Sequence, residues 1–226
     1  MTRGTLRRVI AARVRPSAPI LALCALAALF GLFVGSGLLA APDPAESEGS
    51  RAGQSLAGRL LVAAPGMDDA HFKDTVILMV RHNDQGALGI IVNKVLGTYP
   101  AAEVLREFGS KDVEAAGKIR VHFGGPVGPF IAFVLHSTDY QDDKSQIVAP
   151  GIAVTSDKSI LERIAKGEGP DRSVVAIGYA GWGPGQLENE IARGSWYIAT
   201  ADPSIVFSDD TESEWSRAVK IGGLDL

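Results

Sequence analysis

Two histidines with serine and aspartate nearby are the first residues in the sequence that suggest chemistry. His82 and His136 each end a predicted strand, and Asp84 and Ser137 lie close to them in the chain. Ser137, His82 and Asp84 supply the residue types of a serine hydrolase triad. However, Ser137 follows His136 directly, and neighbouring residues of a strand point to opposite faces of a sheet. Ser137 also matches no nucleophile motif. We therefore favour half-buried, hydrogen-bonded histidines and keep His82 and His136 as candidate ligand-binding residues.

A metal centre is the second chemistry to consider. The four histidines, His71, His82, His122 and His136, show neither the i, i+4 pairing on a helix nor the Cys/His spacing that marks a metal site. The single cysteine, Cys24, lies in an apolar N-terminal stretch, so the rest of the chain can form neither a disulfide nor a thiolate site. We expect no metal site and no cofactor.

A glycine-rich loop in "GYAGWGPGQLENEI" follows a predicted strand and opens a predicted helix. The N-terminus of a helix can bind an anion, but this glycine spacing matches neither the P-loop nor the dinucleotide fingerprint. Glu188 and Glu190 would repel a phosphate there, so we favour a tight turn that lets two elements pack closely. The candidate ligand-binding residues of this loop are Gly181, Trp182, Gly183 and Gln186.

A second group of candidate residues combines a strand end with another loop. Asn93 and Lys94 end a predicted strand, and Gly124 and Gly125 lie in "HFGGP". Together they offer amide, ammonium and backbone donors to an anionic ligand. The alternative is a capped turn with no ligand, which we favour.

The elements that must position these residues are about nine strands and four short helices. The β-branched runs 74–82 and 87–94 flank the turn "NDQG" and predict a hairpin. Capping and turn residues predict the helices at 99–109, 156–169, 184–194 and 212–223. Because hairpins dominate the first half and strands and helices do not alternate regularly, the predicted class is α+β with a mixed sheet.

The N-terminal 41 residues differ from the rest in charge and hydropathy. Residues 1–18 form a basic segment with five arginines, and residues 19–41 carry no charge. A helix over 19–41 would be about 34 Å long, enough to span a bilayer. The positive-inside tendency then predicts an inner-membrane protein with one span and its domain in the periplasm. The alternatives are a cleaved signal peptide, with the domain exported, and a misassigned start site, with the domain in the cytoplasm.

The remainder divides into a predicted flexible linker, residues 42–57, and one folded domain, residues 58–226. Removing the five N-terminal arginines from the 22 basic residues leaves 17, against 26 acidic residues. Such an acidic region repels a phosphate backbone, so direct nucleic-acid binding is disfavoured.

Several segments of the domain closely resemble the YqgE/AlgH family of bacterial proteins. They are "GRLLVAAPGMDDAHFKDTVILMVRH", "GALGIIVNK", "HFGGPVG", "FVLH" and "GYAGWGPGQLENEI". The resemblance covers roughly residues 58–222. It implies a mostly antiparallel branched sheet rolled into a pseudo-barrel, and no established enzyme activity. The family's description as a transcriptional regulator is itself a proposal.

Two classes of function follow. The first is a non-catalytic binding or regulatory module, tethered to the membrane through residues 19–41, whose partner is an unidentified protein or small molecule. The second is a hydrolase-like enzyme that uses a histidine. A cytosolic transcriptional regulator is a further alternative. We favour the non-catalytic module.

Overall fold

The structure, a computed structural model, describes residues 5–13, 55–110, 115–211 and 213–222. Its strands are β1 (Arg59–Ala63), β2 (Val76–Asn83), β3 (Gly86–Ile91), β4 (Val95–Pro100), β5 (Lys118–Phe123), β6 (Val127–His136), β7 (Gln146–Ala149), β8 (Ile152–Thr155), β9 (Ser173–Trp182) and β10 (Trp196–Thr200). Its helices are α1 (Thr5–Arg13), α2 (Ala101–Glu107), α3 (Ser159–Lys166), α4 (Gln186–Ala192), α5 (Pro203–Val206) and α6 (Glu214–Ile221).

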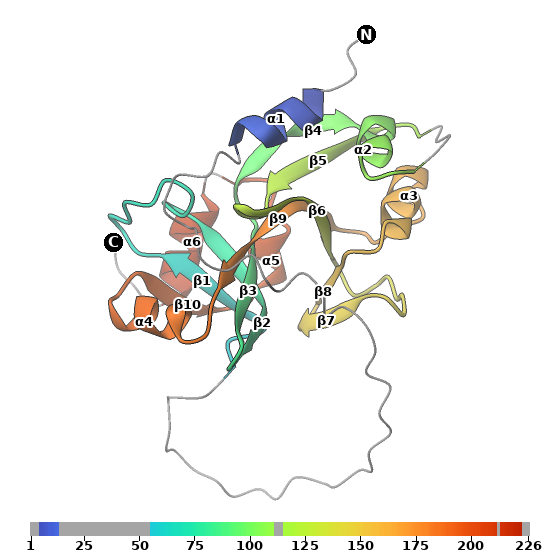
Figure 1. The fold of residues 1–226 in the computed structure, drawn as a ribbon. Coiled ribbons are helices and arrows are strands. Elements are labelled where there is room, and N and C mark those ends of the chain that lie inside the picture. Colours follow the sequence, from blue (N-terminus) through green and yellow to red (C-terminus); the bar gives the residue numbers. More distant parts are fainter. Residues whose placement is uncertain (1–4, 14–54, 111–114, 212, 223–226) are drawn as a thin grey trace, which may run out of the picture.

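The strands form one curled, branched sheet in the order β10-β1-β2-β3-β9-β6-β8-β7, and the β4–β5 pair joins it at β9 (Figure 1). Only the β5–β9 pairing is parallel among the described strands. The expected α+β class with a mostly antiparallel branched sheet is confirmed, and the sheet curls into a half-barrel. The expected four helices are too few, because the described residues also contain α1 and α5.

Strand β9 is the branch point of the sheet. Its first half pairs with β5 at Val175–Ile177, and its second half pairs with β3. The backbones cross closely where the partner changes. A Cβ atom on Gly178 would collide with the carbonyl oxygen of Gly125, and a Cβ on Gly125 would collide with the backbone of Tyr179. Gly178 also has a φ of 74°, a conformation that favours glycine. These glycines are therefore required by the branch.

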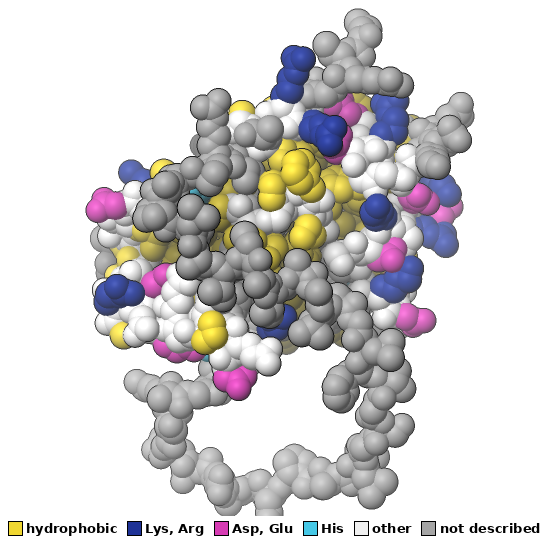
Figure 2. Space-filling view, in the orientation of Figure 1, with side chains coloured by type: hydrophobic (Ala, Val, Ile, Leu, Met, Phe, Trp, Pro, Cys, Tyr) yellow, Lys and Arg dark blue, Asp and Glu magenta, His cyan; other side chains and the backbone are white. Residues whose placement is uncertain are grey.

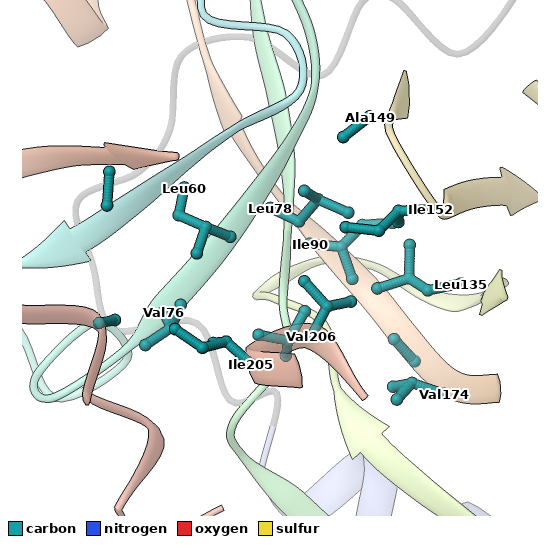
Figure 3. Packing of buried hydrophobic residues seen from close by; sticks show 14 of the residues in the cluster. Leu60, Val76, Leu78, Ile90, Leu135, Ala149, Ile152, Val174, Ile205 and Val206 are labelled. Carbon is teal, nitrogen blue, oxygen red and sulfur yellow. The ribbon is translucent and has the colours of Figure 1, made fainter. Parts of the chain in front are cut away.

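The largest apolar core lies inside the curl of the sheet. Leu60, Leu78 and Ile90 come from neighbouring strands and are fully buried (Figure 3). Helix α5 contributes Ile205 and Val206 to the same cluster. The alternating apolar residues that predicted the strands therefore fill one continuous interior.

Helix α1 packs against the domain instead of standing apart from it. Leu6 and Ile10 are 1% and 2% exposed and belong to a core cluster with residues of α2 and β4. The predicted inner-membrane arrangement, with residues 1–18 and the domain on opposite sides, is therefore wrong, because two elements in contact lie on the same side. None of the helices in the described residues is long and apolar enough to cross a bilayer. The segment 19–41 and residues 42–54 of the predicted linker lie outside those residues.

Candidate functional site

Candidate residues from the sequence lie at three places along β9. His136 pairs with Ser173 at the start of the strand, and Gly124 donates its N–H to the Ile177 carbonyl at the middle (2.8 Å). Trp182 is the last residue of β9. The sheet thus separates His136 from the glycine-tryptophan loop, and each group has to be judged by itself.

The glycine-tryptophan loop is held by one carboxylate, which we call the Glu190 corner. The indole Nε1–H groups of Trp182 and Trp196 both donate to Glu190 Oε2, at 2.9 and 2.8 Å. Gln186 Nε2 donates to the other oxygen, Oε1, at 2.9 Å. Trp182 and Trp196 are buried, at 6% and 3% exposure. Glu190 therefore ties α4 to β9 and β10.

The backbone of the same loop is also engaged within the protein. The Gly183 N–H donates to Gln186 Oε1 at 3.1 Å, and Gly181 lies opposite Leu88 in the sheet. These donors face partners in the chain, so the geometry favours a structural turn over an anion-binding loop.

His82 has both ring nitrogens occupied. The Leu56 N–H donates to Nδ1 at 3.0 Å, so the ring proton of the neutral side chain sits on Nε2. That nitrogen donates to Glu188 Oε1 at 2.8 Å. A general base needs a free lone pair, and His82 offers none in this arrangement. Its geometry ties the residues before β1 to α4.

The polar groups of Asn93 serve the fold as well. Its Oδ1 accepts from the Val76 N–H and its Nδ2 donates to the Asp74 carbonyl, both at 2.8 Å. Gly124 is hydrogen-bonded to Ile91 and Ile177 through its own backbone. Of the second group of candidates, Lys94 is among the residues that line the cavity described below.

His136 lies in a different environment from His82. It is fully buried, and its Nδ1–H donates to the Ser137 carbonyl at 2.9 Å. Its Nε2 therefore accepts from the hydroxyl of half-buried Ser145, also at 2.9 Å. This tautomer is the one that a general base requires. The serine whose hydroxyl contacts the His136 ring is therefore Ser145. The hydroxyl of Ser137 contacts the backbone of Arg172 instead.

A cavity of about 250 Å³ lies where the loop after β1 approaches the ends of β3 and β5. Its lining residues are Ala70, His71, Lys94 and Phe123. Asp69 Oδ1 accepts from the His71 backbone N–H at 2.8 Å and lies 3.3 Å from His71 Nδ1. Because Asp69 engages Nδ1, it orients the ring and leaves Nε2 for a ligand. We call this the His71–Lys94 cavity.

The Glu190 corner supports one wall of this cavity. The Phe72 ring follows His71 and stacks on Trp182 with centroids 6.4 Å apart. It also meets the edge of Trp196 at 5.6 Å. The loop that carries His71 is therefore packed against a hydrogen-bonded, buried pair of indoles.

Two buried titratable groups lie outside these sites. Burial raises the pKa of the Glu214 carboxyl to about 8, and neither of its oxygens has a hydrogen-bond partner among the described residues. Burial lowers the pKa of the His122 imidazole to about 4, although its hydrogen bond to the Val92 carbonyl opposes the shift. Both groups are therefore mostly neutral near pH 7.

The sequence indicated Lys94 but missed the other lining residues of the cavity. His71 was considered only as a metal ligand, and in the described part of the chain no cluster of three His, Cys, Asp or Glu residues is suited to a metal ion. Asp69, two residues before His71, was the available signal, because an Asp at that spacing commonly forms a local turn.

A family model described as AlgH-like matches residues 60–226, and the chain therefore belongs to that family. A UPF0301 protein from Methylococcus capsulatus is 43% identical over 169 residues, which cover 75% of this chain and 92% of the relative. A UPF0301 protein from Afipia carboxidovorans is 40% identical and covers 84% and 93%.

Solved structures show the same fold. The solution structure of the AlgH protein from Pseudomonas aeruginosa has a TM-score of 0.65 and 33% identity, over 80% of this chain and 94% of that one. A crystal structure of a protein from Corynebacterium diphtheriae has a TM-score of 0.59 and 24% identity, over 73% and 85%. The second likeness concerns the fold alone.

Proposed function

We propose that this member of the AlgH-like family is a non-catalytic binding module whose ligand is a small organic anion held in the His71–Lys94 cavity. The observation that carries the proposal is the lining, which brings together a lysine, a histidine and a phenylalanine, namely Lys94, His71 and Phe123. Phe123 is 6% exposed and its ring centroid lies 6.4 Å from that of His71. A cavity of this size and chemistry suits one anionic group attached to a small apolar body.

The test uses benzoate and inorganic phosphate as probes, titrated into the full chain and followed by NMR. Benzoate carries both a carboxylate and an apolar ring, whereas phosphate carries charge alone. We expect benzoate to bind more tightly, and Lys94→Met to weaken its binding about tenfold, the value of one charge-assisted hydrogen bond.

The matched control is Lys73→Met. Lys73 is an exposed lysine of the same loop that does not line the cavity, so benzoate should bind this variant as it binds the unaltered chain. Absence of benzoate binding at millimolar concentration, or equal losses in both variants, contradicts the proposal.

A serine hydrolase is a second candidate function, favoured by the 2.9 Å contact between Ser145 Oγ and His136 Nε2. In a hydrolase, His136 would take the proton of Ser145 while the Ser137 carbonyl holds the ring. A fluorophosphonate probe, which reacts with activated serines, distinguishes the two candidates. Labelling that disappears in Ser145→Ala and persists in Ser137→Ala would support the hydrolase. We expect no labelling.

A further inference from the structure

Helix α1 packs against α2 and β4 of the domain (Figure 1), and we call the apolar surface that it covers the α2–β4 groove. Leu6 and Ile10 are four residues apart and lie on one face of the helix. Both side chains are buried among Tyr99, Val104 and Leu105. The groove therefore accepts an apolar pair at helical spacing.

Two acidic residues of α2 contact the same helix. Glu103 Oε1 accepts a hydrogen bond from the Leu6 N–H at 3.2 Å, and Glu107 Oε1 lies 3.4 Å from Arg7 Nε. The first N–H groups of a helix have no partner within the helix, and a carboxylate beside them is favourable. Because Glu103 and Glu107 are one turn apart, they lie on the same face of α2. Figure 2 shows basic and acidic side chains next to each other over this region.

The groove belongs to the family domain, whereas α1 does not. The AlgH-like region begins at residue 60, and residues 14–54 separate α1 from the described part of the domain. A domain that carries an apolar groove with two carboxylates at its rim presents a surface of defined chemistry. Here a segment from outside the domain covers that surface.

We propose that the groove between α2 and β4 is a docking site for a basic amphipathic helix, that α1 is its resident occupant, and that a helix of the same chemistry from a partner protein competes for it. The partner helix carries two large aliphatic residues four positions apart, with an arginine directly after the first, as in Leu6, Arg7 and Ile10. The two glutamates select for positive charge, and the excess of acidic residues in 42–226 favours the same kind of partner.

The competition has a physical basis in the length and tethering of α1. A helix of nine residues is marginal in water by itself, so α1 depends on the groove for its stability. Its covalent attachment supplies a high effective concentration, which a partner has to exceed. Weakening α1 in cis should therefore open the groove to a helix in trans.

The experiment measures binding of a fluorescein-labelled peptide with the sequence of residues 1–16 to the full chain by fluorescence anisotropy. The Leu6→Asp/Ile10→Asp variant removes the apolar contacts of α1. We expect it to bind the peptide at least tenfold more tightly than the unaltered chain does, because its groove is open. Equal affinity for both chains, or no binding to the variant, would overturn the proposal.

Further variants test the charge recognition. Glu103→Gln/Glu107→Gln, added to the opened chain, should weaken peptide binding about tenfold, whereas Glu168→Gln, at an exposed glutamate beyond α3, should leave it unchanged. Should the aspartate variant fail to fold, Arg7→Glu/Arg8→Glu, at two exposed positions, opens the groove by charge alone. That chain should also bind the peptide more tightly than the unaltered one, and equal binding again contradicts the proposal.

Discussion

The Glu190 corner and the His71–Lys94 cavity are neighbours joined through Phe72, but the corner is a packed hydrogen-bonded cluster and the cavity encloses a space. In the corner, one carboxylate accepts three hydrogen bonds from side chains of the same chain. In the cavity, His71 and Lys94 line a space of about 250 Å³. The glycine-tryptophan motif therefore forms the structural corner. Residues outside that motif line the adjacent cavity.

The largest expected effect comes from breaking the corner. Glu190→Ala leaves two buried indole N–H groups without an acceptor, and we expect the free energy of unfolding to fall by about 3 kcal/mol. Glu190→Gln keeps one oxygen acceptor and should cost less. Urea denaturation measures both, with Asn189→Ala, at an exposed position on the same helix, as the control. A loss below about 1 kcal/mol in Glu190→Ala would show that the carboxylate does not hold the corner.

A buried carboxylate without partners sharpens the contrast with Glu190. The folded chain keeps the Glu214 proton up to about pH 8, whereas the unfolded chain releases it near pH 4.5. Between these values the folded state binds more protons, so the free energy of unfolding falls as pH rises, by at most about 1.4 kcal/mol per pH unit. Glu214→Gln should remove this fall. Denaturation at pH 7 and pH 8 tests it, and parallel curves for both chains would contradict the pKa.

The pH range chosen for the Glu214 measurement depends on His122, because His122 changes the free energy of unfolding with pH in the opposite direction. Its pKa is about 4 in the folded chain and 6.5 in the unfolded one. Between these values the unfolded state binds more protons, so His122 makes stability rise with pH. The two groups therefore oppose each other between about pH 4.5 and 6.5. Above that range the contribution of Glu214 stands alone.

Sequence patterns predicted most strands because their signal is local. The hairpin of β2 and β3 follows from two β-branched runs around a short turn. Strand β4 was missed, since it contains Gly97 and ends at Pro100, residues that are uncommon in strands. Its pairing with β5 comes from residues about twenty positions away, which no local pattern records.

The candidate site was harder to predict, because its contacts join distant segments. Residues 1–18 were predicted only as a basic segment, although the spacing of the apolar pair Leu6 and Ile10 indicates an amphipathic helix. The role of Glu190 depends on Trp196, which is placed by the pairing of β10 with β1. The charges of Glu188 and Glu190 predicted a loop without a phosphate, but the hydrogen bonds that these two residues form with His82, Trp182 and Trp196 were not foreseen.

A smaller loss of stability is expected from breaking the exposed contact between Glu188 and His82, next to the Glu190 corner. Glu188 accepts from His82, but its side chain is 54% exposed, so solvent screens the interaction. Glu188→Ala should lower the free energy of unfolding by about 0.5 kcal/mol, and Glu188→Gln, which keeps an acceptor, by less. Urea denaturation gives both values. A loss as large as that of Glu190→Ala would make His82 and Glu188 part of the corner.

The smallest effect on stability should come from the cavity itself, and this prediction separates support from site most directly. His71→Ala removes a partly exposed ring whose hydrogen bond is to a neighbouring aspartate, so the free energy of unfolding should change by less than about 0.5 kcal/mol. Benzoate binding, measured by NMR titration, should weaken about tenfold, because the ligand loses one polar contact. Asp69→Asn keeps the side-chain oxygen that accepts from the His71 backbone and should weaken binding less. If His71→Ala instead destabilises the chain as Glu190→Ala does, the imidazole belongs to the support, and the cavity has no side chain reserved for a ligand at that wall.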